Sequence, residues 1–173
     1  MLQIKRSILV LAWLTVLCGL LYPLVVTGIA QSLFPSEANG SLIYKGETVI
    51  GSRLIGQSFT RPDYFSGRPS AINPPYDASN SGGSNLAPSN AKLILQVQAR
   101  VADMRLKNSL ADDVTVPADL VLASASGLDP HISPASASLQ ARRVGDHRRI
   151  PQAKIEDLIR QNTEQPLLGI WRS

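Results

Sequence analysis

An uncharged apolar stretch near the N-terminus most constrains what this chain can fold into. Residues 7–30 read SILVLAWLTVLCGLLYPLVVTGIA and contain no charged side chain. As a helix, these about 24 residues span roughly 36 Å, which is enough to cross the ~30 Å hydrocarbon core of a bilayer with some tilt. Lys5 and Arg6 precede the stretch, whereas the first charged residue after it is Glu37. The positive-inside rule therefore predicts a cytoplasmic N-terminus and a remainder outside.

A cleaved signal peptide is the alternative interpretation, because Gly28 and Ala30 resemble a small-x-small cleavage site. The apolar run, however, exceeds the ~7–15 residues that are usual for a signal peptide. Cys18 follows the bulky Leu17, which suits a lipoprotein site poorly. We therefore predict an anchor helix over residues 1–33, and one small extracytoplasmic domain over residues 34–173. The chain would then be a single-pass protein of the cell (inner) membrane.

The pattern after the anchor predicts a mixed α/β (α+β) domain. Two β-prone runs flank Lys45-Gly46 and indicate a hairpin within residues 41–52. Residues 57–88 are rich in proline and glycine and show neither helical nor strand periodicity. This stretch carries several aromatic residues, which disordered segments usually lack. We expect an ordered loop that packs on the domain or on a partner; the aromatic residues are Phe59, Tyr64, Phe65 and Tyr76.

Helices are expected in four places after the loop. The first runs from a cap at Ser89 or Asn90 to about Asn108, and a short one follows Pro117. A third runs from Ser133-Pro134 to about Asp146, and Pro151 opens the last. The expected buried faces are Leu93, Val97, Val101 and Met104 on the first long helix, Ala137, Ala141 and Val144 on the second, and Ile155, Leu158 and Ile159 on the last.

Charge and cysteine content exclude several classes of function. The formal net charge is +4, of which Lys5 and Arg6 supply two, so the rest of the chain sums to 4 − 2 = +2. Such a balance does not favour nucleic-acid binding. The one dense basic patch is interpreted as a solvated helix face, with a partner or lipid-phosphate contact as the alternative; it comprises Arg142, Arg143, Arg148 and Arg149. With a single cysteine, neither an internal disulfide nor a Cys2His2 zinc site can form, and no metal site is expected.

Asp129, His131 and Ser133 have the residue types of a hydrolase triad, but their spacing argues against one. Residues two apart in one turn rarely align nucleophile, base and orienting group, and no G-x-S-x-G motif is present. We instead expect Asp129 and Ser133 to satisfy backbone donors at a turn and a helix start. The Ser81–Asn85 stretch lacks a P-loop lysine, and Gln140 is a weak candidate for ligand binding. No catalytic residue is predicted, which favours an interaction role.

Three segments of the chain carry a family resemblance. They are GSRLIGQSFTRPDYFSGRPSA at residues 51–71, SGGSNLAPSN at 81–90, and VPADLVLASASGLDPHISPASASLQARRV at 116–144. In this order, behind one anchor helix, they resemble the C subunit of the Kdp-type potassium-transporting ATPase of bacteria. The similarity extends over about residues 8–163. Departures from the family pattern are Ala87 and Ala125, which stand where glycine is expected, and the ending TEQPLLGIWRS.

The resemblance implies a non-catalytic accessory subunit of an ATP-driven, high-affinity potassium importer. Its implied partners are a channel-like potassium-translocating subunit and a P-type ATPase subunit. It further implies a catalytic chaperone role, in which ATP is bound more tightly in a transient complex with the ATPase subunit. Because an outer domain cannot touch a cytoplasmic nucleotide, we expect this effect to be indirect.

The residues that we expect at a partner interface lie in the long loop and in the later turn. They are Phe59, Tyr64, Phe65, Arg68, Asn85, Asp129, His131 and Ser133. Two other functions remain open at this point. One is an exported hydrolase that uses Ser133 or His131, and the other is a binding protein released by cleavage after Ala30.

Overall fold

The computed structural model describes residues 2–164. These divide into two compact units, of which the first ends at Arg53 and the second begins at Leu54. The first unit begins with one long helix. It consists of α1 (Leu2–Val16), the π-helical turn η1 (Leu17–Leu21) and α2 (Tyr22–Leu33). None of its residues is buried within the protein, and it is long and apolar enough to cross a membrane. The predicted span is therefore present as a helix.

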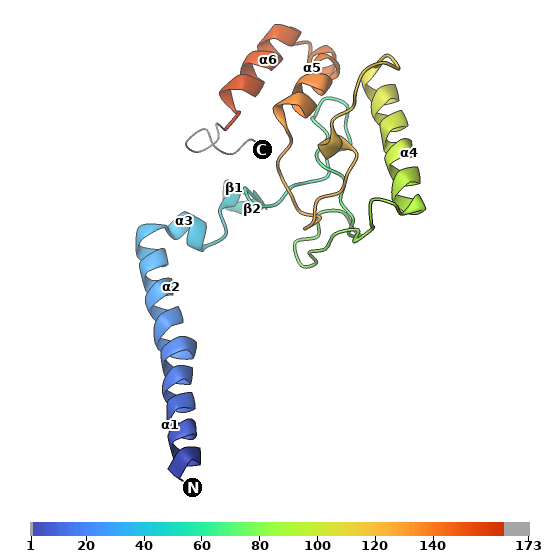
Figure 1. The fold of residues 1–173 in the computed structure, drawn as a ribbon. Helices are drawn as coiled ribbons and strands as arrows, with labels where there is room; N and C mark the ends of the chain where they lie inside the picture. The colour runs from blue at the N-terminus through green and yellow to red at the C-terminus, as the bar shows by residue number, and fades with distance from the viewer. Residues whose placement is uncertain (1, 165–173) are drawn as a thin grey trace. The chain divides into compact units, whose positions relative to one another are not determined.

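Pro23 is accommodated by the wider π-helical turn that precedes it. Proline has no backbone N–H and its ring crowds the carbonyl four residues earlier, so an α-helix is usually kinked there. In η1 the Tyr22 N–H donates to the Leu17 carbonyl, five residues back. The helix continues from η1 into α2 without a break (Figure 1).

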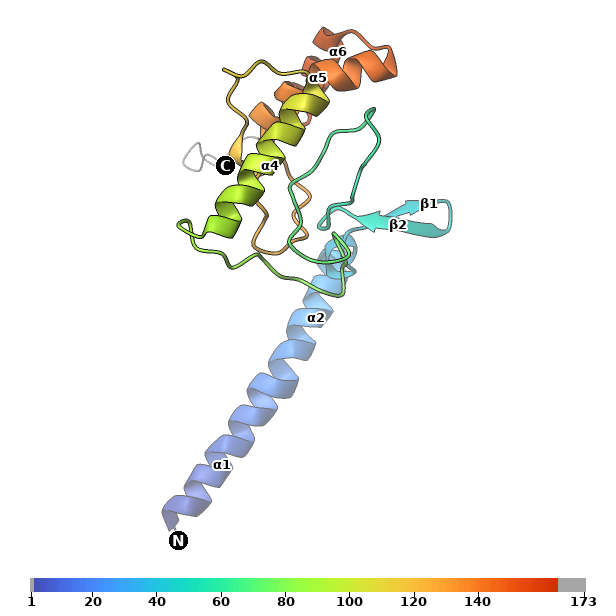
Figure 2. The same ribbon diagram turned by 90° about the vertical axis from the view of Figure 1, so that its right-hand side faces the viewer.

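A short helix and a hairpin complete the first unit. Helix α3 (Pro35–Ala38) leads to strands β1 (Leu42–Lys45) and β2 (Thr48–Ser52), which pair antiparallel. Gly46 takes a φ of +64° at the turn, as the Lys45-Gly46 signal indicated. The pairing register shifts between Ile43 and Tyr44. Figure 2 shows the two strands side by side as a hairpin. The hairpin prediction is thus confirmed.

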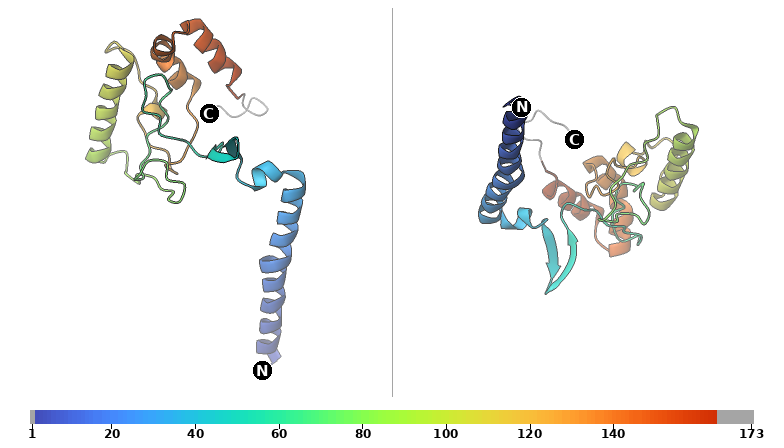
Figure 3. Two further views of the ribbon diagram at one scale, coloured as in Figure 1. Left: turned by 180° about the vertical axis from the view of Figure 1, so that it is seen from behind. Right: turned by 90° about the horizontal axis from the view of Figure 1, so that it is seen from below.

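The second unit combines helices with long irregular segments. It contains α4 (Ala91–Asn108), the 3₁₀ turn η2 (Ala118–Leu120), α5 (Pro134–Arg148) and α6 (Gln152–Gln161). Figures 1 and 3 show the long loop and the segment after α4 lying between α4 and the α5–α6 pair. The fold is therefore a mixture of helices and one small sheet, in keeping with the predicted α+β class.

Two small apolar clusters hold the second unit together. The first joins α4 to η2 through Met104, Leu120 and Val121. The second joins α5 to α6 through Ala141, Val144 and Ile155, and Phe65 of the long loop packs against it. Burial of this kind stabilises a fold by roughly 25 cal/mol per Å² of apolar surface.

The predicted helix starts are confirmed by their caps. Asn90 Oδ1 accepts a hydrogen bond from the Lys92 N–H, and Ser133 Oγ accepts one from the Ser136 N–H. Helix α5 ends at Arg148, slightly later than predicted. One prediction for α6 is wrong, because Leu158 is 40% exposed rather than part of the buried face.

Candidate functional site

The long loop, residues 54–90, is fixed along one side by the turn at residues 126–128. The Gly56 N–H donates to the Leu128 carbonyl at 2.8 Å, and the Gly82 N–H donates to the Ser126 carbonyl at 2.9 Å. Gly127 has a φ of +70°, and a Cβ there would lie 2.8 Å from the Gly82 carbonyl oxygen. Only glycine permits both this conformation and this close approach. The loop is therefore an ordered part of the domain, as its aromatic content indicated.

Helix α5 holds the other side of the loop with three polar side chains. Gln140 bonds both backbone groups of Ser66. Arg143 donates to the carbonyls of Pro62 and Tyr64 and to Asn108 Oδ1, and Arg148 donates to the Asp63 carbonyl. Burial lowers the pKa of Arg143. We call these contacts bracing: the side chains hold in place a segment that has no regular backbone hydrogen bonding of its own.

This bracing presents an aromatic and cationic cluster at the surface. The Phe59 and Tyr64 rings stack with centroids 5.1 Å apart. The guanidinium groups of Arg61 and Arg148 lie 5.7 and 4.9 Å from the Tyr64 ring centroid. Arg61 also pairs with Asp63 at 2.9 Å, and the hydrogen bond from Arg61 lowers the pKa of that carboxyl. Phe59 remains 47% exposed and Tyr64 36% exposed, a composition that is typical of protein interfaces.

Asp129 joins the loop to the later turn. Its Oδ2 accepts from Arg68 at 2.9 Å, and its Oδ1 accepts from the His131 N–H at 3.0 Å and lies 3.2 Å from His131 Nδ1. Partial burial by itself would raise the pKa of Asp129, but the hydrogen bonds from His131 and Arg68 outweigh it and lower the pKa. Asp129 is therefore a carboxylate at neutral pH that holds the loop and the turn together.

Ser133 belongs to a different network from His131. Its Oγ donates to Asp119 Oδ1 at 3.1 Å, and its N–H donates to Asp119 Oδ2 at 2.7 Å. Ser136 Oγ donates to the same carboxylate at 2.6 Å. Burial would raise the pKa of Asp119, but these donors lower it. Ser133 thus caps α5 and bonds Asp119. Asp129, His131 and Ser133 do not form the hydrogen-bonded chain of a catalytic triad. The expectation that Asp129 and Ser133 satisfy backbone donors at a turn and at a helix start is confirmed.

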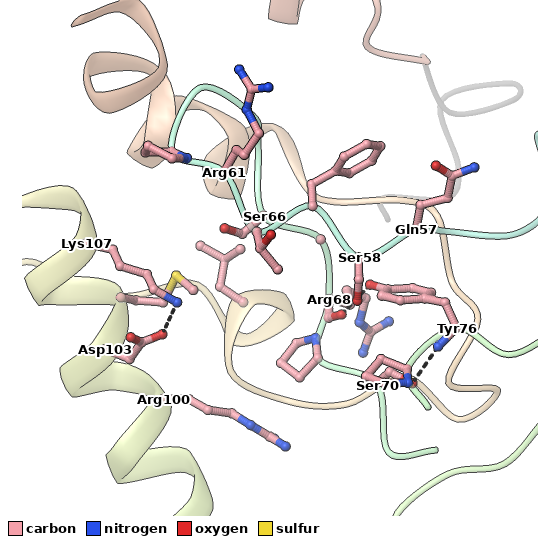
Figure 4. Close-up of a pocket in the computed structure, with 18 of the residues that line it drawn as sticks. Gln57, Ser58, Arg61, Ser66, Arg68, Ser70, Tyr76, Arg100, Asp103 and Lys107 are labelled. Atoms are coloured by element: carbon pink, nitrogen blue, oxygen red, sulfur yellow. Dashed lines mark hydrogen bonds and ion pairs between the residues drawn. The ribbon is translucent and has the colours of Figure 1, made fainter. Parts of the chain in front are cut away.

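A cavity of about 430 Å³ that carries several charged side chains lies between the loop and α4 (Figure 4). The loop lines it with Arg68, Ser70 and Tyr76, and α4 lines it with Arg100 and the Asp103–Lys107 pair, whose charged atoms are 2.7 Å apart. Arg100 donates to the Val121 carbonyl. Burial, together with the nearby Asp129 charge, raises the pKa of Tyr76. Cationic groups outnumber carboxylates around this cavity, so it suits ordered water or a small anion.

The predicted interface residues separate into exposed and inward-facing groups. Phe59 and Tyr64 lie together at the surface, whereas Arg68 is partly buried and bonds Asp129. Phe65 instead packs against the α5–α6 cluster. The remaining members are Asn85, which has a left-handed φ of +51°, His131, which is exposed, and Ser133, which is bonded to Asp119. Their roles toward a partner stay predictions.

Gln140 is fully buried, with a relative exposure of 0%. Its Oε1 accepts from the Ser66 N–H and from Arg143, and its Nε2 donates to the carbonyls of Ser66 and Ser136. All of these bonds lie within the protein. A ligand could reach the amide only if the loop moved away from α5.

Three functional side chains were not identified as such from the sequence. Arg143 was interpreted as part of a solvated face, but it is half-buried and bonds the loop. Asp119 bonds both Ser133 and Ser136, and Tyr76, expected only as one of the loop aromatics, donates to the Arg68 carbonyl. The spacing of Gln140 and Arg143, one helical turn apart beside Ala141 and Val144, was the available signal for Arg143.

Comparison with known proteins identifies the family. A family model described as "K+-transporting ATPase, c chain" matches residues 4–173. A relative from Polaromonas naphthalenivorans, named as a potassium-transporting ATPase KdpC subunit, is 54% identical over 170 residues, which cover 97% of this chain and 86% of the relative. A second relative of that name, from Beijerinckia indica subsp. indica, is 51% identical over 167 residues, which cover 96% of this chain and 84% of the relative. The chain therefore belongs to the KdpC family, the c chain of the potassium-transporting ATPase.

Proposed function

We propose that the chain is the accessory, non-catalytic subunit of an ATP-driven potassium importer, and that it supports assembly of the complex. Its partners would be the channel-like potassium-translocating subunit and the P-type ATPase subunit of the same complex. The observation that carries the proposal is the braced loop. A proline-rich segment is held by α5 so that stacked Phe59 and Tyr64, flanked by arginines, remain at the surface.

Such a cluster is costly to leave exposed unless another protein covers it. Aromatic and arginine side chains are enriched at interface hot spots because they bury large areas with few rotatable bonds. Bracing by Gln140, Arg143 and Arg148 means that little ordering entropy remains to be lost on association. The loop is therefore suited to bind a preformed partner surface.

The second part of the proposal concerns the apolar helix and the side of the membrane on which the domain lies. Helix Leu2–Leu33 would anchor the chain in the cell membrane, with Lys5 and Arg6 on the cytoplasmic side and residues 34–173 outside. In that orientation the domain cannot contact cytoplasmic ATP. Any support of ATP use by the ATPase subunit would be transmitted through the membrane helices, and Gln140 would act as a brace rather than as a nucleotide ligand.

Co-purification of the three subunits tests the assembly role. The tagged chain is expressed with both partners, solubilised in mild detergent and purified, as wild type and as the Phe59→Glu/Tyr64→Glu double variant. We expect the double variant to lose both large partners, because it removes the two stacked rings that would supply the aromatic contact area of the interface. A tag after Ser173 that is reached by protease only from outside the cell membrane checks the orientation.

Leu95→Glu is the matched control, since Leu95 is 65% exposed on α4 and is not part of the aromatic cluster. It should leave the complex intact. Loss of the partners in Leu95→Glu but not in the double variant would move the interface to α4 and contradict the proposal. Circular dichroism of each variant confirms that the domain is folded. Recovery of wild-type chain alone in co-expressing cells would instead favour the exported binding protein.

A further inference from the structure

The hairpin of the first unit has one apolar face. Paired residues of antiparallel strands point to the same side of the sheet, and successive residues along a strand alternate between the two sides. Two of the pairs share one face, and they are Leu42–Ser52 and Tyr44–Val49. The other two share the opposite face, and they are Ile43–Gly51 and Lys45–Thr48. We call the side that carries Leu42, Tyr44 and Val49 the apolar face of the hairpin.

The apolar face is exposed to a degree that is unusual for a strand. Leu42 is 41% exposed, Val49 is 49% exposed and Tyr44 is 60% exposed. Among the described residues the sheet has two strands only. Such a hairpin is marginally stable in water unless its apolar side packs against something else. The apolar face is therefore built to be covered.

Hydrogen bonds tie the base of the hairpin to the last turn of α2. The side-chain amides of Gln31 and Asn39 exchange two hydrogen bonds, at 3.3 and 3.2 Å. The next residue, Gly40, accepts a hydrogen bond from Ser52 Oγ at 2.7 Å. Figures 2 and 3 show the hairpin projecting sideways from the end of α2 rather than continuing along the helix. The hairpin thus begins at the level where the long helix ends.

That level corresponds to the surface of a bilayer that the helix crosses. The uncharged residues 7–30 match the hydrocarbon core, so Gln31 lies at its edge. Beyond the core, the headgroup layer is about 5–8 Å thick on each side. An element that leaves the helix sideways at Gln31 therefore runs along this layer.

We propose that the apolar face of the hairpin lies on the lipid surface, within the headgroup layer beside the anchor helix. The inference rests on the proposed membrane anchoring, but not on the assembly role or on the orientation of the chain. Because the helix already holds the hairpin at the bilayer, contact with lipid costs little further translational freedom. A separate protein would first have to be recruited to the same face.

The chemistry of the hairpin fits a flat position at this depth. Lys45 and Glu47 flank the turn, so insertion of the turn into the hydrocarbon core would bury two charges at high cost. Tyr44 combines an apolar ring with a polar hydroxyl, as residues at membrane interfaces commonly do. The headgroup layer also supplies water to the backbone groups at a sheet edge, which the hydrocarbon core does not.

Spin labels on the full-length chain in lipid nanodiscs test the proposal. The nanodiscs contain phosphatidylethanolamine and phosphatidylglycerol in equal amounts. Cys18→Ser removes the one native cysteine, and Val49→Cys then carries the label on the apolar face. Collisions of the label with oxygen, which enters lipid, are compared with collisions with a water-soluble nickel chelate. We expect the oxygen-to-nickel ratio to exceed that of the control by at least about threefold, because interfacial elements bury their apolar side ~5–10 Å deep.

Thr48→Cys is the matched control, since Thr48 is the neighbour on the same strand and points to the opposite face. Tyr44→Cys and Lys45→Cys repeat the comparison on β1, so a single poorly folded variant does not decide the result. Leu14→Cys, within α1, reports on the anchor itself. A lipid-like ratio at Leu14 with equal ratios within both hairpin pairs would overturn the hairpin proposal alone. A water-like ratio at Leu14 would overturn the proposed anchoring, and this inference with it.

A protein cover would give a different signature from lipid. Shielding of the Val49→Cys label from both reagents in the lone chain would show that protein packs on the apolar face, and it would overturn the proposal. The measurement is repeated on the complex purified with both partner subunits, where the same high ratio is expected. Shielding from both reagents in the complex would assign the face to a partner subunit and would likewise overturn the proposal. Circular dichroism verifies that each labelled variant is folded.

Discussion

Gln140 and Ser66 exchange two hydrogen bonds across 74 residues of sequence. Gln140 Oε1 accepts from the Ser66 N–H at 2.8 Å, and Gln140 Nε2 donates to the Ser66 carbonyl at 3.2 Å. The side-chain amide thereby pairs with the N–H and the carbonyl of a loop residue, as the backbone of a neighbouring strand would in a sheet. Because the braced segment lies beside Phe59 and Tyr64, this pair connects the core of the domain to the proposed interface.

Replacing Gln140 should therefore destabilise the domain more than a typical polar substitution. Gln140→Leu keeps the approximate shape but leaves both partly buried backbone groups of Ser66 without this partner, and each such group costs up to roughly 1–3 kcal/mol when it is left unsatisfied. We expect a loss of at least about 2 kcal/mol in urea unfolding followed by circular dichroism. Gln98→Leu, at an exposed position of α4, should change stability by less than ~0.5 kcal/mol. Equal effects of the two substitutions would contradict the bracing role.

Gly145→Ala should weaken the α5–α6 contact, although alanine normally favours a helix over glycine by about 1 kcal/mol. A Cβ at Gly145 would lie 2.8 Å from the Ile150 carbonyl oxygen, so the backbone after α5 would have to shift. We expect a loss of about 1–3 kcal/mol of stability. Gly28→Ala is the control, since a Cβ there meets nothing within 4 Å. A stabilised Gly145→Ala variant in thermal unfolding would show that the two helices are less closely packed.

Asp119 should make the stability of the domain depend on acid pH. Its pKa is lowered in the folded state, because the donors from Ser133 and Ser136 outweigh the effect of burial. A carboxyl with a lowered folded pKa contributes stability above its unfolded pKa of about 3.9, and this is lost as the pH falls through the folded pKa. Asp119→Asn should cost about 1–3 kcal/mol at pH 7 and lose less stability than the wild type below about pH 4.

Unfolding curves at a series of pH values check this prediction. Asp112→Asn serves as the control, because that side chain is fully exposed. It should follow the wild-type pH dependence. Parallel curves for the wild type and Asp119→Asn throughout the acid range would show that Asp119 does not titrate with folding.

Arg68→Ala and Asp129→Ala should weaken assembly of the complex without unfolding the domain. Both side chains keep about a quarter of their surface exposed, and their 2.9 Å pair joins the loop to the later turn. Loss of either would remove this tie and let the loop shift relative to the turn. We expect recovery of the partner subunits to fall at least about fivefold, which corresponds to ~1 kcal/mol of binding free energy.

The Asp103–Lys107 pair provides the control for a charge effect. It is an exposed ion pair on α4 with a distance of 2.7 Å. Lys107→Ala should leave recovery of the partners unchanged, because such pairs contribute little. Unchanged subunit stoichiometry in both Arg68→Ala and Asp129→Ala would remove these residues from the interface.

The elements whose signals are local could be predicted from the sequence. The charge-free stretch determines the N-terminal helix, and the caps Asn90 and Ser133 determine where α4 and α5 begin. The Lys45-Gly46 turn determines the hairpin. Each signal lies within a few residues of the structure that it specifies, so hydrogen bonding and burial within one element suffice to explain it.

Only the tertiary structure decided what the polar side chains of the second unit do. Gln140, Arg143 and Asp119 look like ordinary surface or capping residues in sequence, and Leu158 looks like a core residue. Their actual environments depend on contacts with segments that are distant in the chain, such as Arg143 with Tyr64 and Asp119 with Ser136. Periodicity tells which face of a helix is apolar, but it does not tell which irregular segment covers that face. The loop has no periodicity, so its path, and with it the candidate interface, became visible only when its backbone partners were known.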